Sequence, residues 1–230
     1  MAGRTSRAAR LVARSAVFPR MTLEDVQSIA GPQHLAVLGG VVEGAPDGIG
    51  TLLLLGPAEP GFWAHFTAQP EYLDGLADPL DRWSERIIGG IAESMNARAY
   101  FPFGGPPWHP FVSWALASGR AHLSPVGLLV HDRAGLMVSY RGAIGFKETL
   151  ALPDAGPNPC DTCATQPCRS ACPVDAFGDD GYDVAACKTD LDQPKNDCMS
   201  KGCAVRRACP LSRRHGRLEE QSAFHMRAFK

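Results

Sequence analysis

The chain has 230 residues, of which 45% are hydrophobic and 20% are charged, and its formal net charge is −1. These values are ordinary for a soluble globular protein. The longest apolar run, Thr51 to Leu55, is far shorter than the roughly 20 residues that a membrane helix needs. No apolar signal-peptide core is present either. Membrane and secreted classes are therefore excluded, and we expect a soluble cytoplasmic protein.

Residues 1–20 differ in charge from the rest of the chain, because they hold five arginines and no acid. The remainder therefore carries a net charge of −6. An arginine-rich leader without acids is typical of a transit peptide. The alternatives are a disordered tail or a start codon assigned too early, with Met21 as the first residue of the protein. We treat residues 1–20 as lying outside the fold.

Hydrophobic periodicity and turn residues predict the elements of the next segment. An acidic first turn after Thr22 predicts a helix start, and Pro70 interrupts a second helical pattern. Glycines between residues 39 and 50 match neither the dinucleotide-binding fingerprint nor the P-loop, so we interpret them as a loop between strands. The predicted elements are helix 22–30, strand 34–38, strand 51–56, an interrupted helix over 62–75, amphipathic helix 80–97 and strand 98–103.

A helix is predicted over residues 111–118, after a turn rich in proline and glycine. Strands 127–131 and 136–142 follow, and the short Asp132–Gly135 turn between them predicts a β-hairpin. Three prolines between residues 153 and 159 then mark a linker. We therefore predict three segments after the leader, which are a first domain over 21–153, a cysteine domain over 154–212 and a basic tail over 213–230.

All eight cysteines lie beyond residue 159, and such clustering indicates metal ligation. Cys172 and Cys209 are each followed by proline. A bacterial ferredoxin takes three thiolates for a cubane cluster from one tight run and the fourth from a Cys-Pro in another run. The same logic predicts two [4Fe-4S] clusters here. The first cysteine set is Cys160, Cys163, Cys168 and Cys209, and the second cysteine set is Cys172, Cys187, Cys198 and Cys203.

The spacing of both runs is wider than the common ferredoxin pattern C-x2-C-x2-C-x3-C-P. The first run is C-x2-C-x4-C-x3-C-P and the second is C-x4-C-x5-C-P, so the assignment of each cysteine to a cluster stays open. Disulfides are a weaker interpretation, because a chain of this length needs no staples. Structural zinc remains an alternative, since CxxC pairs also form zinc knuckles.

A zinc-stabilised module would have a different function, the binding of nucleic acid through a basic face. The residues of that face would be Lys201, Arg206, Arg207, Arg213, Arg214, His215 and Arg217. The segment lacks the interleaved aromatic residues of a stacking surface. Nucleic acid is therefore not the partner that we expect.

Residues 127–135 read G-L-L-V-H-x-x-x-G, and the cysteines follow in a four-one-three order that ends in Cys-Pro. This order resembles the epoxyqueuosine reductases and their relatives, the corrinoid reductive dehalogenases, over about residues 95–212. The resemblance implies an α+β fold, in which a nitroreductase-like domain holds a cobamide and a bacterial-ferredoxin-like two-cluster domain delivers electrons to the cobalt. It also implies that the eight cysteines are the cluster ligands.

Two features of the epoxyqueuosine reductases have no counterpart here. The segment AYFPFGGPPWHP, where the reductases carry an acidic proton donor, holds no carboxylate. The C-terminal repeats that help the reductases grip tRNA are also missing, so we do not expect epoxyqueuosine reduction. Tyr100 and His109 are the remaining candidates for a catalytic role, whereas Trp108 and Tyr140 are expected to pack.

The sequence therefore predicts an iron–sulfur electron-transfer protein of ferredoxin type, which passes electrons to a redox partner protein or to a site in its own first domain. The alternative is a reductase of the resembling family that holds a cobamide or a flavin. Arg206 and Arg207 lie between two of the cysteines, and we expect them to raise the cluster potential if they approach it.

Overall fold

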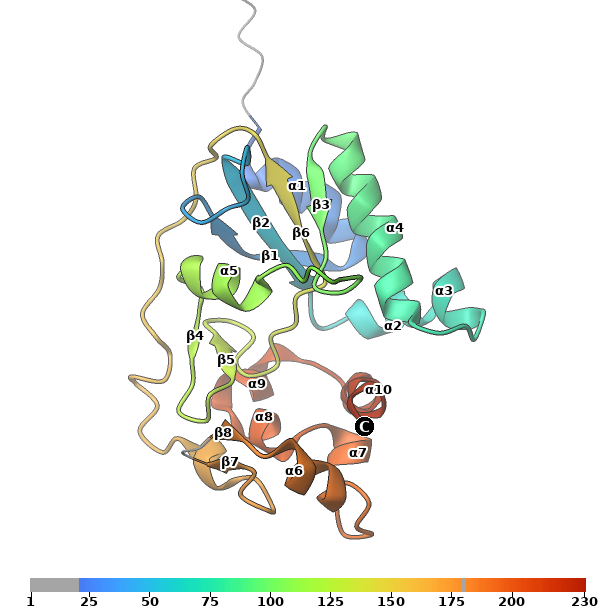
Figure 1. Cartoon of the computed structure of the whole chain (residues 1–230), viewed down its shortest axis with the longest axis vertical. Coiled ribbons are helices and arrows are strands. Elements are labelled where there is room, and N and C mark those ends of the chain that lie inside the picture. Colours follow the sequence, from blue (N-terminus) through green and yellow to red (C-terminus); the bar gives the residue numbers. More distant parts are fainter. Residues whose placement is uncertain (1–20, 179–180) are drawn as a thin grey trace, which may run out of the picture.

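The computed structural model describes residues 21–178 and 181–230, and Figure 1 shows the arrangement of its elements. Helices lie beside antiparallel strands, so the predicted α+β class is confirmed. The arginine-rich leader, residues 1–20, lies outside the described residues. Within the described part of the chain, no helix combines the length and the apolar character that crossing a membrane requires.

The helices of the first part follow the predicted pattern. α1 begins after Thr22, whose side chain accepts a hydrogen bond from the Asp25 N–H while the Asp25 carboxylate accepts one from the Thr22 N–H. Pro70 separates two short helices, as predicted. The helices are α1 Leu23–Ala30, α2 Phe62–Thr67, α3 Pro70–Leu73, α4 Pro79–Ser94 and α5 Phe111–Ala117, and a 3-10 turn, η1, covers Gly31–Gln33.

A four-stranded antiparallel sheet forms the centre of the first part, in the order β1-β2-β6-β3. Its strands are β1 Leu35–Val41, β2 Thr51–Pro57, β3 Arg98–Tyr100 and β6 Gly142–Phe146. Successive side chains of β2 point to opposite faces of the sheet. Leu53 and Leu55 pack with α1 and α4 on one face, and Leu52 and Leu54 pack with α5 on the other.

The predicted hairpin of strands 127–131 and 136–142 is wrong. β5 pairs instead with β4 in a separate two-stranded sheet, and β6 belongs to the large sheet. The turn after β5 is held by the His131 side chain, whose Nδ1 accepts hydrogen bonds from two backbone N–H groups of the turn. The bounds of the small sheet are β4 Ala121–Leu123 and β5 Leu129–His131.

The backbone of residues 136–137 is held by side chains from the C-terminal part of the chain. The Leu136 N–H donates a hydrogen bond to the Ser212 hydroxyl over 2.9 Å. The Arg217 guanidinium donates to the Met137 carbonyl over 3.1 Å. These distant side chains satisfy backbone groups that a strand partner would otherwise take. Local periodicity carries no sign of them, which is why the hairpin prediction failed.

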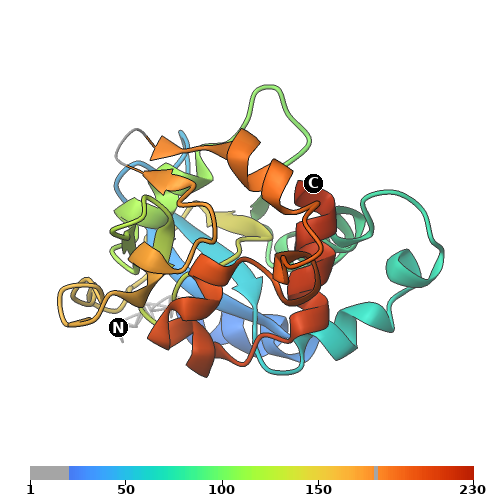
Figure 2. The ribbon, with the colours of Figure 1, turned by 90° about the horizontal axis from the view of Figure 1, so that it is seen from below.

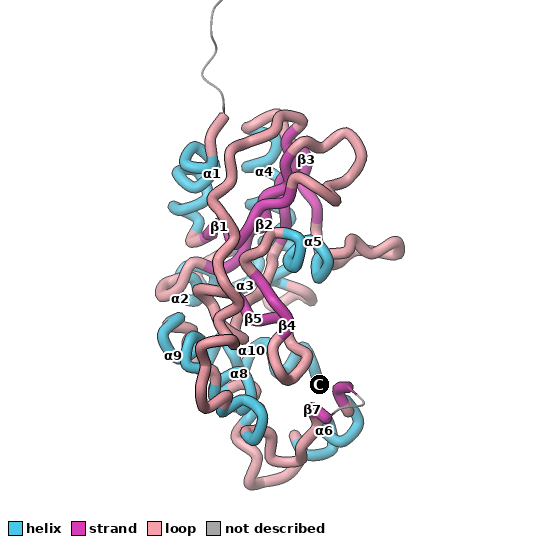
Figure 3. Tube along the Cα trace, turned by 90° about the vertical axis from the view of Figure 1, so that its left-hand side faces the viewer, coloured by secondary structure: helices cyan, strands magenta, loops and turns pink. Residues whose placement is uncertain are grey.

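The cysteines lie in a second part made of short helices and loops, below the sheet in Figures 1 and 3. Residues 151–158, in the predicted linker, form no helix or strand. Seen from below, the orange and red segments of this part lie in front of the sheet (Figure 2). Its elements are the 3-10 turn η2 Pro167–Ser170, β7 Phe177–Gly178, β8 Gly181–Tyr182, α6 Val184–Asp190, α7 Cys198–Lys201, α8 Ala204–Ala208, α9 Pro210–His215 and α10 Glu219–Phe229.

Residues 213–230, predicted as a basic tail, instead complete α9 and form α10. The Phe224 ring on α10 lies 5.4 Å from the Trp63 ring of the first part. Ser222, also on α10, packs against Gly202, where an added Cβ would come within 2.5 Å of the Ser222 Cβ. Gly202 also has a positive φ of 88°, which favours glycine. The C-terminal helix therefore contacts both parts of the molecule.

Candidate functional site

The first cysteine set surrounds a cavity of about 370 Å³. Cys168 and Cys209 are buried, while Cys160 and Cys163 are partly exposed. Apolar side chains complete the wall of this cavity, and they are Val130, Leu136 and Leu211. The structure thus brings together all four cysteines that the sequence grouped as the first set.

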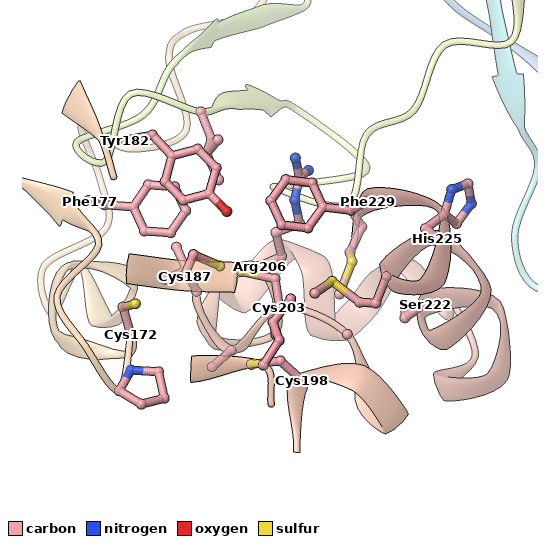
Figure 4. Close-up of a pocket in the computed structure, with 18 of the residues that line it drawn as sticks. Cys172, Phe177, Tyr182, Cys187, Cys198, Cys203, Arg206, Ser222, His225 and Phe229 are labelled. Atoms are coloured by element: carbon pink, nitrogen blue, oxygen red, sulfur yellow. The ribbon is translucent and has the colours of Figure 1, made fainter. Parts of the chain in front are cut away.

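The second cysteine set surrounds a separate cavity of about 240 Å³, which Figure 4 shows in close-up. Cys198 is buried and the other three cysteines are partly exposed. The wall beyond the sulfurs combines aromatic and polar side chains, which are Phe177, Tyr182, Arg206, Arg217, Ser222, His225 and Phe229. Residues 137–139 of the first part also line this cavity.

Each set takes one cysteine from the other run. Cys209 leaves the later run to join the first cavity, and Cys172 leaves the earlier run to join the second. α8 connects Cys203 to Cys209, and since a helix rises 1.5 Å per residue, the two cysteines are separated by roughly 9 Å along its axis. Cys209 has an extended backbone and Pro210 occupies the first position of α9, so the chain turns at this ligand.

An apolar core common to both sets separates the two cavities. Leu136 and Val205 are buried at its centre. Cys168 and Cys209 of the first set and Cys203 of the second belong to the same core. The two cavities are therefore neighbours, with little more than this core between them.

Burial makes the thiols of both sets hard to ionise without a positive partner. Burial and the neighbouring cysteines raise the pKa of Cys160 to about 11. Burial also raises the pKa of Cys168 and of Cys198. A bound metal provides the positive partner, because a coordinating thiol loses its proton outright. Thiols gathered in fours around a cavity are therefore suited to a cationic group.

The two donor sets fit a [4Fe-4S] cluster, which takes four thiolates. In residues 21–178 and 181–230, no three His, Cys, Asp or Glu side chains are close enough together to hold a single metal ion. A tetrahedral zinc site gathers its sulfurs about 2.3 Å from one ion. In a cubane each thiolate binds a different iron, so the sulfurs stand around the whole cluster. Four cysteines line each cavity, which is the number of thiolates that a cubane takes.

Sequence reasoning missed the aromatic and polar wall of the second cavity. Tyr182 stacks on Phe177 with ring centroids 4.4 Å apart, and Phe229 lies 6.2 Å from Tyr182. The Nε2 atom of His225 is buried and has no hydrogen-bond partner among the described residues. Burial, with nearby arginines, lowers the pKa of His225 well below its usual range. No motif marks these residues, because the fold alone brings β8 and α10 to the cysteines.

Two arginines that the sequence assigned to a basic face line the second cavity instead. Arg206 and Arg217 both donate hydrogen bonds to backbone carbonyls of residues 136–137. Burial lowers the pKa of Arg217 to about 10. Arg207 forms an ion pair with Asp197. The seven basic residues therefore do not form one continuous face toward solvent.

Tyr100 and His109, the candidates for a catalytic role, lie together with ring centroids 5.2 Å apart. Neither residue lines either cysteine cavity. Trp108, which was expected to pack, is 64% exposed, because residues 106–110 form an exposed loop. Tyr140 packs against the core, as predicted. The structure thus separates these candidates from the cysteines.

No protein-family model, no curated protein and no solved structure matches this chain. All eight cysteines are free thiols, and their division into two cavities of four is the strongest functional signal.

Proposed function

We propose that this protein transfers electrons through two [4Fe-4S] clusters, one on each cysteine set. The observation that carries the proposal is the division of the eight cysteines into two cavities, each lined by four sulfurs. Both cavities draw on both cysteine runs, as in the ligand exchange of two-cluster ferredoxins.

A [4Fe-4S] cluster supplies reversible one-electron transfer when it is bound. The chain contributes thiolates from both runs and an apolar core between the two sites. Leu136 and Val205 exclude water from that core. A dry and narrow separation keeps the path between the two sites short and limits the rearrangement of solvent during transfer.

The first acceptor class that we propose is a redox partner protein. A reductase with a second cofactor, a cobamide or a flavin, is the alternative, and one observation favours it. Residues 137–139 of the first part line the second cavity, so electrons at the second cysteine set would stand at the junction with the first part. A cofactor held by the first part would be within reach there.

Anaerobic purification of the full chain, with analysis of iron, sulfide, zinc and cobalt and a visible spectrum, tests the proposal. Two clusters require about eight iron and eight sulfide per chain, together with a broad absorption band that dithionite bleaches. Cobalt, or flavin bands that stay with the protein, would promote the reductase. A colourless protein with two zinc ions would overturn the electron-transfer proposal and support the zinc module.

A further inference from the structure

We propose that the second cysteine set holds the cluster of higher potential, that Tyr182 and Arg206 create the difference, and that electrons pass from the first set to the second. This inference rests on the proposed function and gives it a direction. The step is a one-electron transfer in which the group on the first set is oxidised and the group on the second set is reduced. An external one-electron donor protein replenishes the first set.

Arg206 brings positive charge to the second cavity. Its guanidinium donates a hydrogen bond to the Leu136 carbonyl, which fixes the side chain. Arg206 lines the second cavity together with Cys203, which precedes it by three residues in the chain. An arginine stays protonated in proteins, so a fixed positive charge lies close to one of the cluster sulfurs.

Tyr182 points its hydroxyl toward the sulfur of Cys187 (Figure 4). The ring is held by Phe177, since the two rings are nearly parallel, at 3°. A tyrosine hydroxyl carries its proton at neutral pH and can donate a hydrogen bond to a thiolate sulfur.

Backbone donors add to this polarity. The Ala176 N–H donates to the Cys172 sulfur over 3.3 Å. In the second set, Cys172 and Cys187 thus have a donor beside the sulfur, and Arg206 lines the cavity together with Cys203. Each of these groups favours a sulfur that carries more negative charge.

The first cavity has a different environment. Its wall, like that of the second cavity, is mainly apolar, but the arginine that lines it, Arg214, is exposed. Each site has an acidic neighbour, Asp161 beside Cys160 and Asp190 in the wall of the second cavity. Arg169 lies near Cys168 but is exposed, and water and salt screen exposed charges more strongly than buried ones.

Reduction adds one negative charge to a cluster. Fixed donors and a partly buried cation stabilise that charge more than an exposed cation does, because water and salt screen them less. The second site therefore has the higher potential, and electrons move toward it spontaneously. Both cavities touch the first part of the molecule, so the difference in potential, and not position, sets the direction of transfer.

An anaerobic redox titration of the holoprotein, followed by electron paramagnetic resonance, measures both potentials. Cys163→Ser and Cys187→Ser each disturb one ligand set and so assign the two signals. We expect Arg206→Gln to lower the reduced-to-oxidised ratio of the second cluster about tenfold, which is about 59 mV for one electron. Tyr182→Phe should lower it about threefold, as expected for the loss of one hydrogen bond.

Tyr182→Phe keeps the stacked ring, so the potential of the second cluster can be measured in this variant even if Arg206→Gln incorporates the cluster poorly. Tyr72→Phe and Arg214→Gln are the matched controls, and neither should move the second potential. A higher potential at the first set overturns the inference, as does an unchanged second potential in Tyr182→Phe. Absence of any cluster signal in the wild type would instead overturn the proposed function itself.

Discussion

The two cysteine cavities have the same number of thiols and different surroundings. Apolar side chains make up most of both walls. Exposed charges lie beside the first cavity, whereas an aromatic row, Arg206 and α10 line the second. Since both sets offer the same donor atoms, any difference in chemistry between them must come from these surroundings.

The two cavities also differ in how far their wall residues lie from the cysteines along the chain. Segments near the cysteines supply most of the first wall, together with β5 and the residues beside it. The second wall needs α10, which is itself held by Phe224 against the aromatic cluster of the first part. Four residues of the first part line each cavity, so both sites depend on the docking of the two parts, and the second depends in addition on α10.

The largest expected effect follows from removing one ligand of each set. Cys198→Ser should lower the iron content from about eight to about four per chain, because a cubane needs all four thiolates. Cys168→Ser should give the same loss at the other site. Iron and sulfide analysis with electron paramagnetic resonance would show which of the two signals disappears in each variant.

The exchange of one cysteine between the two runs provides the most decisive test of the ligand assignment. Cys209→Ser should remove the same signal as Cys168→Ser, although Cys209 belongs to the later run. Cys172→Ser should remove the same signal as Cys198→Ser. If the lost signals followed the runs instead of the cavities, the assignment of ligands would be wrong.

The next effect in size comes from Phe224. Phe224→Ala removes the contact of α10 with Trp63 and should lower the free energy of unfolding by about 2–3 kcal/mol, somewhat less than the 3–5 kcal/mol of a fully buried phenylalanine. The second cluster should also bleach faster in air than the first, since α10 covers only the second cavity. Denaturant unfolding and the rate of loss of each signal measure the two effects.

Leu218→Ala is the control for this variant. Leu218 precedes α10 and is 44% exposed, so its loss should change stability by less than about 0.5 kcal/mol. Equal bleaching of the two clusters in Phe224→Ala would contradict a protective role for α10.

The elements of the first part were readable from the sequence because their signals are local. The alternating faces of β2, the capping box at Thr22 and the break at Pro70 all act within a few residues. The Cys-Pro endings indicated an exchange of one cysteine between the two runs, and the cavities group the cysteines in that way, although the wide spacing had left the assignment of ligands open. The residues that cause each of these features lie close to it in the sequence.

The surroundings of the second cavity were not predictable in this way. The segment after His131 looked like a strand, yet its backbone partners are Ser212, Arg206 and Arg217, at least 70 residues away in the sequence. Basic residues near a chain end looked like a solvated tail, although two of them turn inward. Tertiary contacts decide the structure of both segments, and the hydrophobic periodicity of the sequence gives no sign of these contacts.

A smaller effect is expected from pH, and it should again fall on the second site first. Burial lowers the pKa of His215 to about 4 and that of His225 well below its usual 6.5. A histidine whose pKa is lowered in the fold contributes stability that is present above pH 6.5 and is lost as the pH falls toward the lower value. The free energy of unfolding should therefore decline below pH 6.5.

His225→Gln separates this contribution from those of other groups. It should reduce the slope of stability against pH by at most about 1.4 kcal/mol per pH unit, the limit for one proton. A wild-type protein equally stable at pH 7 and pH 5 would rule out this account of the buried histidines.

The smallest expected effect concerns Arg207, which the sequence treated as equivalent to Arg206. Arg207 lies near Cys198, but its guanidinium is paired with Asp197 and its side chain is 29% exposed. The carboxylate offsets its positive charge and water screens the remainder. Arg207→Gln should therefore shift the second potential less than Arg206→Gln in the same redox titration, with a change in the reduced-to-oxidised ratio below about threefold. Equal shifts in the two variants would mean that pairing and exposure do not separate the two arginines, and that formal charge near the cysteines is sufficient to set the potential.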